Sequence, residues 1–98
     1  MLNVQQYMPA IQDACKSFGV TELYLFGSAL TESFGEDSDV DVLASFAPGK
    51  GIFMRFMGFK ERLEEIFGRK VDVVMPEGIR NPIFEEEVMS TRRQVYAA

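Results

Sequence analysis

The chain of 98 residues contains no histidine and a single cysteine, Cys15. Histidine serves enzymes as a general base and as a metal ligand near neutral pH, so its absence excludes zinc hydrolases and Ser-His-Asp or Cys-His catalysis. One cysteine forms no internal disulfide, and Cys15 falls on the apolar stripe of a predicted helix, where we interpret it as a core residue. Chemistry in this chain must therefore come from carboxylates, hydroxyls and backbone groups.

Long apolar runs and basic stripes are missing as well. The longest uninterrupted apolar segments are a few residues, far below the ~20 needed to cross a bilayer, and no charged-then-apolar signal pattern opens the chain. We therefore expect a cytoplasmic protein without membrane contact. Fifteen acidic residues against ten basic ones give a net charge of -5. With no extended basic stripe, direct binding to nucleic acid is not expected.

What the sequence does contain is an alternation of helical and strand patterns. With 47% hydrophobic residues, the 98 residues suffice for one modest core, so we expect a single small domain over residues 1–98. The order predicts an α/β fold, with three or more strands flanked by helices. The predicted helices are Val4–Phe18, Ile52–Phe67 and Pro82–Tyr96, and the predicted strands are Thr21–Phe26, Ser38–Phe46 and Val71–Met75.

Asp39 and Asp41 are the first candidate functional residues. One residue apart on a strand, their carboxylates point to the same face of the sheet. Their neighbours Val40 and Val42 favour burial, and buried carboxylates are costly unless a cation or hydrogen-bond donors compensate them. A divalent metal would do so. In the alternative interpretation, Asp39 is a turn residue and Asp41 faces water on an edge strand.

Asp72 is the third candidate acid. The helix Ile52–Phe67 is long enough for a right-handed crossover, which would make the strands before and after it parallel neighbours. Asp72 lies near the start of its strand, as the Asp39–Asp41 pair does, so we expect all three carboxylates at one rim of the sheet. Taken alone, an aspartate between valines also fits a half-exposed strand.

Gly27 and Ser28 end the first predicted strand, and the short spacer that follows must bring them close to the acids. Glycine allows backbone to approach a phosphate, and the free N–H groups of the next turn favour an anion. In the alternative interpretation Ser28 only caps that turn. Clustered oxygen ligands suit Mg²⁺ or Mn²⁺, and two such ions ~3.5–4 Å apart would orient a triphosphate for nucleotidyl transfer.

Several segments between Leu23 and the C-terminus resemble a known family. The chain is similar to the minimal nucleotidyltransferase (MNT) proteins of the DNA polymerase β-like nucleotidyltransferase superfamily. The segments that carry the resemblance are Leu25-Phe26-Gly27-Ser28-Ala29-Leu30, Asp37-Ser38-Asp39-Val40-Asp41-Val42, Arg69-Lys70-Val71-Asp72-Val73-Val74 and Pro76-Glu77-Gly78.

This resemblance implies a mixed sheet in the polymerase β-like nucleotidyltransferase fold, magnesium, and a nucleoside triphosphate donor. It implies Asp39, Asp41 and Asp72 as metal ligands, with Asp72 also the candidate base for the incoming hydroxyl, and Gly27 and Ser28 as phosphate contacts. It further implies a HEPN-type toxin as partner and an antitoxin that moves AMP from ATP to a tyrosine of that toxin. A non-catalytic antitoxin that blocks its partner sterically is the alternative.

The sequence departs from the family pattern in its cations. Ala29 and Thr31 stand where many relatives carry arginines, and Gly35 and Glu36 stand where a basic residue and a proline are common. Fewer positive side chains near the triphosphate leave its charge to the metals or to a residue from elsewhere in the chain. Lys50 is one candidate, although a lysine between two glycines also fits a solvated loop tip.

Overall fold

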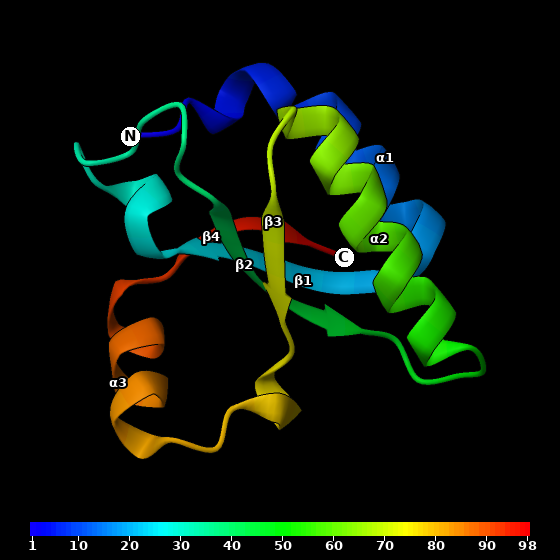
Figure 1. Ribbon diagram of the computed structural model, residues 1–98. Coiled ribbons are helices and arrows are strands. Elements are labelled where there is room, and N and C mark those ends of the chain that lie inside the picture. Colours follow the sequence, from blue (N-terminus) through cyan, green and yellow to red (C-terminus); the bar gives the residue numbers. More distant parts are fainter.

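A four-stranded sheet in the order β3-β2-β1-β4 forms the frame of the protein, which a computed structural model describes over residues 1–98 (Figure 1). β2 and β3 are parallel and β1 is antiparallel to both β2 and β4, so the sheet is mixed. In chain order the elements are the 3-10 turn η1 (Val4–Tyr7), α1 (Met8–Phe18), β1 (Val20–Phe26), the 3-10 turn η2 (Gly27–Leu30), β2 (Val40–Phe46), α2 (Ile52–Phe67), β3 (Val71–Val74), the 3-10 turn η3 (Pro76–Gly78), α3 (Pro82–Thr91) and β4 (Arg93–Ala97).

α1 and α2 lie side by side on one face of the sheet, and this face holds the main core (Figure 1). Ile11 of α1 and Leu63 of α2 are almost completely buried, and they pack in one cluster with Leu25 and Val42 of the sheet. Because alternate strand residues point to the same face, the hydrophobic residues of this cluster follow the period of two that a half-covered strand requires.

The opposite face of the sheet is covered by α3 and by the short η3 segment, with Ile79 packing on the cluster there (Figure 1). Phe26, Leu43 and Val88 form a small buried cluster there. Asp41 lies two residues before Leu43 in β2, so its side chain shares this face. The predicted acidic site therefore lies on the less covered side of the sheet.

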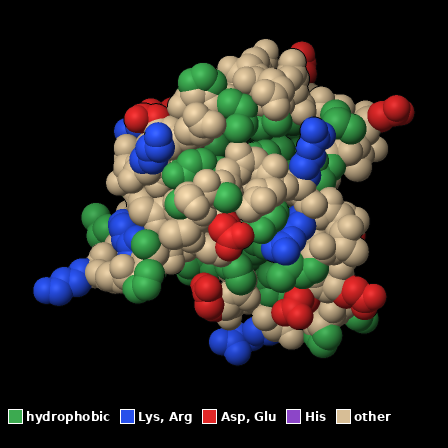
Figure 2. All heavy atoms as spheres, turned by 180° about the vertical axis from the view of Figure 1, so that it is seen from behind, with side chains coloured by type: hydrophobic (Ala, Val, Ile, Leu, Met, Phe, Trp, Pro, Cys, Tyr) green, Lys and Arg blue, Asp and Glu red, His purple; other side chains and the backbone are tan.

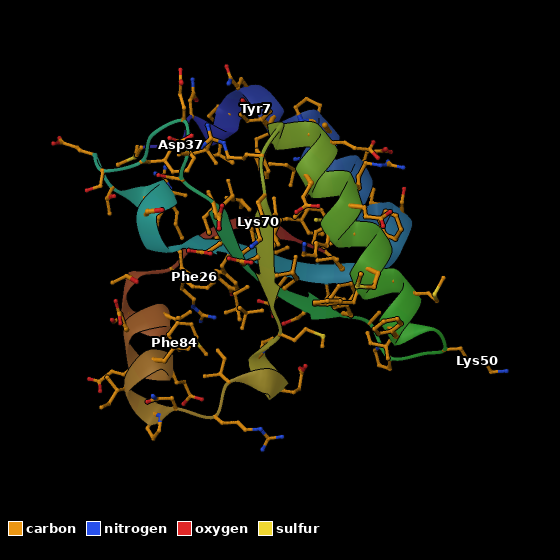
Figure 3. The ribbon with its side chains drawn as sticks, in the orientation of Figure 1. Tyr7, Phe26, Asp37, Lys50, Lys70 and Phe84 are labelled. Carbon is orange, nitrogen blue, oxygen red and sulfur yellow. The ribbon has the colours of Figure 1, made fainter.

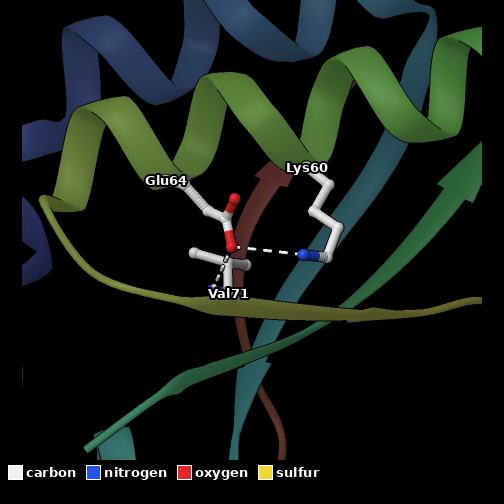
Figure 4. Close-up of polar contacts among 3 residues, drawn as sticks. All are labelled: Lys60, Glu64 and Val71. Carbon is white, nitrogen blue, oxygen red and sulfur yellow. Dashed lines mark hydrogen bonds and ion pairs between the residues drawn. The ribbon is translucent and has the colours of Figure 1, made fainter. Parts of the chain in front are cut away.

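Glu64 near the end of α2 fixes the entry into β3. Its Oε2 accepts a hydrogen bond from the backbone N–H of Val71 at 3.1 Å and forms an ion pair with Lys60 Nζ at 3.2 Å (Figure 4). α2 ends at Gly68, whose left-handed backbone (φ 66°) lets the chain turn back toward the sheet. These contacts fix the position at which β3 begins, and therefore the position of Asp72, its second residue.

The prediction of one helix over Pro82–Tyr96 is wrong in its second half. α3 ends at Thr91, and the strand β4 follows and pairs with β1, with Leu23 opposite Tyr96 and Leu25 opposite Arg93. Phe84, Val88 and Val95 fit a helical spacing, but Val95 lies on β4 and packs on the main core. Pairing with β1 satisfies the backbone groups of this segment.

The first turns of α2 are also more exposed than their apolar residues predict. The helical spacing of Phe53 and Phe59 predicts that both belong to the core. Phe59 is fully buried, whereas Phe53 is 69% exposed, so this prediction is wrong for Phe53. Six residues separate them, which at 3.6 residues per turn places their side chains about a third of a turn apart. No helix of the structure, α2 included, combines the length and the apolar character needed to span a bilayer.

Candidate active site

Asp41 and Asp72 occupy the same register position on the parallel strands β2 and β3. Neighbouring strands lie about 4.8 Å apart, so two side chains in register on one face are direct neighbours. β2 pairs with β1 on one side and β3 on the other, which excludes the alternative that Asp41 lies on an edge strand. Asp39 precedes the first residue of β2 and is partly buried. The structure thus brings the predicted acids to one rim of the sheet.

Gly27 packs directly against the Asp41 carboxylate. β1 pairs with β2 so that Phe26 lies opposite Asp41, and the chain then turns at Gly27 with φ 75°. A Cβ atom at position 27 would lie 2.6 Å from Oδ2 of Asp41, closer than real Cβ contacts allow. Both the positive φ and this close approach require glycine at the position. The predicted proximity of the glycine-serine pair to the acids is therefore present in the structure.

Ser28 lies inside the 3-10 turn η2 rather than before it. The residue at the N-terminal boundary of the turn is Phe26, and no side chain caps the turn, so the alternative that Ser28 is only a helix cap is wrong. The Ser28 carbonyl accepts from both the N–H and the hydroxyl of Thr31, at 3.0 and 2.9 Å. The Ser28 hydroxyl itself is left available to a ligand in the adjoining cleft.

The acids act on one another electrostatically. The pKa of Asp41 rises from an ordinary 3.8 to about 6, first through burial, then through the charge of Asp72 and a hydrogen bond with it, and last through the charge of Asp39. No three acidic side chains converge on a single point as a finished metal site. Their carboxylate oxygens are nevertheless the donor type that hard divalent cations prefer, and a cation would relieve the repulsion between Asp41 and its acidic neighbours, so the residue types fit Mg²⁺ or Mn²⁺.

A cleft of about 770 Å³ opens beside Asp41, between η2 and α3. Its apolar wall includes Phe26 and Phe84, whose rings meet edge to face with centroids 5.9 Å apart (Figure 3). The charged side chains that line it, Asp41 and Glu87, are both acidic. An anionic ligand in this cleft would therefore need cations that the lining itself does not supply.

Sequence reasoning missed the part of α3 in this cleft. Acidic residues near the start of a helix complement its dipole, so the sequence of the run Glu85-Glu86-Glu87 predicts a structural role. In the structure, however, Glu87 lines the cleft together with Val88 and Thr91. Ile83 and Met89 of this helix are exposed, and the space-filling view shows acidic and hydrophobic side chains next to one another on the surface (Figure 2). The Asn81-Pro82 pair marks where α3 begins, because the Asn81 side chain accepts from the N–H groups of Ile83 and Phe84, but it does not indicate which surface the helix lines.

Lys50 does not reach the site. It lies in the exposed loop after β2 and projects into solvent at the far side of the molecule from Phe26 and Phe84 (Figure 3). Asp41 is at the start of β2, and the seven-residue strand separates the two by roughly 20 Å. The candidate cation for the triphosphate is thus wrong, and the loop-tip interpretation of Lys50 is right.

Comparisons with known proteins show the family and the fold of the chain. The family model of the nucleotidyltransferase domain matches residues 8–95. The protein adenylyltransferase MntA of Thermococcus cleftensis is 38% identical over 66 residues, which are 67% of this chain and 66% of that protein. A solved structure provisionally named a minimal nucleotidyltransferase superposes with a TM-score of 0.78 at 27% identity, covering 95% of both chains.

A more distant neighbour shows the fold alone. It is an AMPylated HEPN toxin of Shewanella oneidensis in complex with an MNT antitoxin, matched with a TM-score of 0.61 at 19% identity over 96% of this chain and 72% of that one. The resemblance drawn from the Gly27-Ser28 and Asp39-Val40-Asp41 segments and the predicted nucleotidyltransferase fold are both confirmed. The chain belongs to the nucleotidyltransferase domain family.

Proposed function

We propose that this protein is a metal-dependent protein adenylyltransferase that moves AMP from ATP to a tyrosine hydroxyl of a HEPN-type toxin and so acts as its antitoxin. The observation that carries the proposal is the register of Asp41 and Asp72 on β2 and β3, against Gly27 and beside an open cleft. The similarity to a protein named an adenylyltransferase supports AMP as the transferred group. The likeness to an MNT antitoxin bound to a HEPN toxin supports the partner.

Each site residue has a distinct role in this proposal. Asp39, Asp41 and Asp72 would hold two Mg²⁺ ions, or Mn²⁺ in their place, and Asp72 would also accept the proton of the incoming hydroxyl. Gly27 keeps the backbone clear of the phosphates, and the Ser28 hydroxyl donates to a phosphate oxygen. Bound magnesium would neutralise charge on the triphosphate and on the pyrophosphate that leaves when AMP is transferred, and it would lower the cost of forming the attacking tyrosine phenolate.

The acidity of the cleft is the main physical support for metal dependence. A triphosphate entering a cleft lined by Asp41 and Glu87 meets negative charge on both sides, and no lysine or arginine lines the cleft to offset it. Electrostatic repulsion between the ligand and these carboxylates would oppose binding. Divalent cations at the acids reverse the sign of that interaction, and they also remove the repulsion between Asp41 and Asp72.

The test is an AMPylation assay with the HEPN partner, ATP and Mg²⁺. Intact mass spectrometry should detect AMP added to the toxin, peptide mapping should locate it on a tyrosine, and EDTA should prevent it. Asp41→Asn is the matched inactive variant because it keeps the size of the side chain. Toxin silenced equally by wild type and Asp41→Asn, without added mass, would instead establish the steric, non-catalytic antitoxin.

A further inference from the structure

Arg69 connects two segments of the chain that both lead into the acidic rim. It lies between α2 and β3, three residues before Asp72. Its Nη1 donates hydrogen bonds to the carbonyl oxygen of Gly35 at 2.7 Å and to that of Ser38 at 2.9 Å. Its guanidinium also lies over the ring of Phe34, 4.3 Å from the centroid. All of these contacts are to the loop that precedes β2.

The segment that Arg69 holds is a closed turn. The Ser38 N–H donates to the Gly35 carbonyl at 3.1 Å, and the Gly35 N–H donates to Ser38 Oγ at 3.0 Å. Asp39 follows directly, and the next residue, Val40, donates its N–H to the Lys70 carbonyl at 3.0 Å. Asp39 therefore lies between two constrained positions. The turn bonded to Arg69 precedes it, and the hydrogen bond from Val40 to the β3 segment follows it.

Arginine suits this task better than lysine would. Its planar guanidinium donates to two carbonyls while its flat face stacks on an aromatic ring, which a lysine ammonium does only in part. The charge of Arg69 is directed at carbonyl oxygens and the Phe34 ring, and it forms no ion pair, since the one salt bridge of the structure joins Lys60 and Glu64. Nothing in these contacts requires a ligand to be present.

We propose that Arg69 is a positioning residue, which fixes the Gly35–Ser38 turn and thereby holds the Asp39 carboxylate beside Asp41 and Asp72 for the divalent cation. This inference rests on the proposed metal-dependent function and adds to it a residue that touches neither metal nor substrate. Residues that orient metal ligands from behind typically change metal affinity by 10- to 100-fold when they are removed.

The experiment measures two properties of the full chain without nucleotide or partner. Mn²⁺ binding is titrated by electron paramagnetic resonance, and hydrogen exchange is followed at the amides of Phe34 and Ser38, whose N–H groups are bonded within this loop. Arg69→Ala should weaken Mn²⁺ binding roughly tenfold and speed exchange at both amides, and Arg69→Lys should lie between it and wild type. Arg62→Ala, which removes a guanidinium stacked on Phe18 away from the site, is the control and should change neither.

The outcomes separate this inference from the function it rests on. Mn²⁺ affinity within twofold of wild type in Arg69→Ala, or exchange at Ser38 as slow as in wild type, would overturn the role of Arg69. A wild-type protein that binds no Mn²⁺ would contradict the proposed function instead, and the exchange data would still decide whether Arg69 holds the turn. Should Arg69→Ala fail to fold, Arg69→Lys applies the same two measurements.

Discussion

On one face of the sheet, α1 and α2 cover the strands with a cluster of 14 buried residues, whereas the cluster under α3 on the other face has three. The difference reflects what each face must hold. Among the 14 buried residues of the first cluster, the thiol of Cys15 is the only ionisable group, and burial raises its pKa to about 12. The second face carries Asp41 and Asp72 and the cleft, so its apolar cover is incomplete. Most of the stabilising apolar burial thus lies on one side of the strands, and the candidate active site lies on the other.

The largest effect that we predict is on AMP transfer, from a substitution on the face that carries Asp41. Asp41→Asn should lower AMP transfer by at least about 10³-fold, because a metal site contributes several kcal/mol of transition-state stabilisation. The variant should nevertheless fold, since the main core lies on the opposite face. Initial rates with ATP and Mg²⁺, together with circular dichroism, check both parts. Transfer within tenfold of wild type would show that Asp41 is not a metal ligand.

The two faces should also respond differently to the same loss of packing. Val42 and Val88 are equally buried, at 0% and 1% exposure, but they lie in the large and the small cluster respectively. Val42→Ala should cost about 3 kcal/mol of unfolding free energy, from lost burial plus a cavity that the dense core cannot close. Val88→Ala should cost about 1.5 kcal/mol, because α3 can shift to fill the space. Urea unfolding of both variants tests this, and equal losses would contradict the comparison.

Features of the two faces that depend on local sequence patterns can be predicted from the sequence, whereas features that depend on contacts between distant segments cannot. The proximity of Asp41 to Asp72 was predictable because the strand period and the crossover rule depend on local patterns. β4 was not, because Val95 continues the helical spacing of Val88, and only pairing with the distant β1 favours a strand. The position of Glu87 on the cleft was equally hidden, since it depends on how α3 packs against Phe26.

Gly27 affects both the site and the stability of the fold. Gly27→Ala should reduce AMP transfer by about 10²-fold, the penalty for displacing a catalytic group by about 1 Å. The new Cβ would push the Asp41 carboxylate from its place, and the φ of 75° adds about 1 kcal/mol of backbone strain. The steady-state rate and the melting temperature measure the two effects. Gly78→Ala is the matched control, because a Cβ there meets nothing within 4 Å. Wild-type activity in Gly27→Ala would argue against this packing.

Stability should depend on pH through Asp41 when metal is removed with EDTA. Its pKa in the folded protein, about 6, lies above its ordinary 3.8, so folding is favoured by the protonated form. That contribution is complete below pH 3.8 and is lost as the pH rises through 6. Asp41→Asn, which resembles the protonated acid, should match wild type near pH 4 and exceed it at pH 7.5 by about 1 kcal/mol after allowance for solvent screening.

Urea titrations of both proteins at several pH values test this linkage. Parallel stability curves for wild type and Asp41→Asn from pH 4 to 8 would show that Asp41 is not under electrostatic strain. Added Mg²⁺ provides the complementary measurement, because binding to the folded state should raise the stability of wild type at pH 7.5 more than that of the variant. The gap between them should therefore shrink as metal is added.

The smallest predicted effect concerns Glu64, which ties α2 to β3 from the core side. A hydrogen bond from the Val71 N–H, and then the bond to Lys60, lower the pKa of Glu64, so its contribution is present above the ordinary value of 4.5 and is lost as the pH falls through the lowered one. Glu64→Gln keeps an acceptor for Val71 but loses the ion pair, so we expect a cost of about 0.3–0.5 kcal/mol at pH 7 that disappears once the pH has fallen below the lowered pKa of Glu64.

Lys60→Met, which removes only the other partner of the pair, should cost no more than Glu64→Gln. Thermal melts of the two variants and their double mutant measure the coupling between the residues. Glu64 also accepts a hydrogen bond from the Val71 N–H, so Glu64→Ala should lower stability the most in this series. It should also lower AMP transfer, because the start of β3 is then less firmly held. A drop in AMP transfer with Glu64→Ala but not with Lys60→Met would therefore show that the main-core face sets the position of Asp72 through the backbone of β3 rather than through charge.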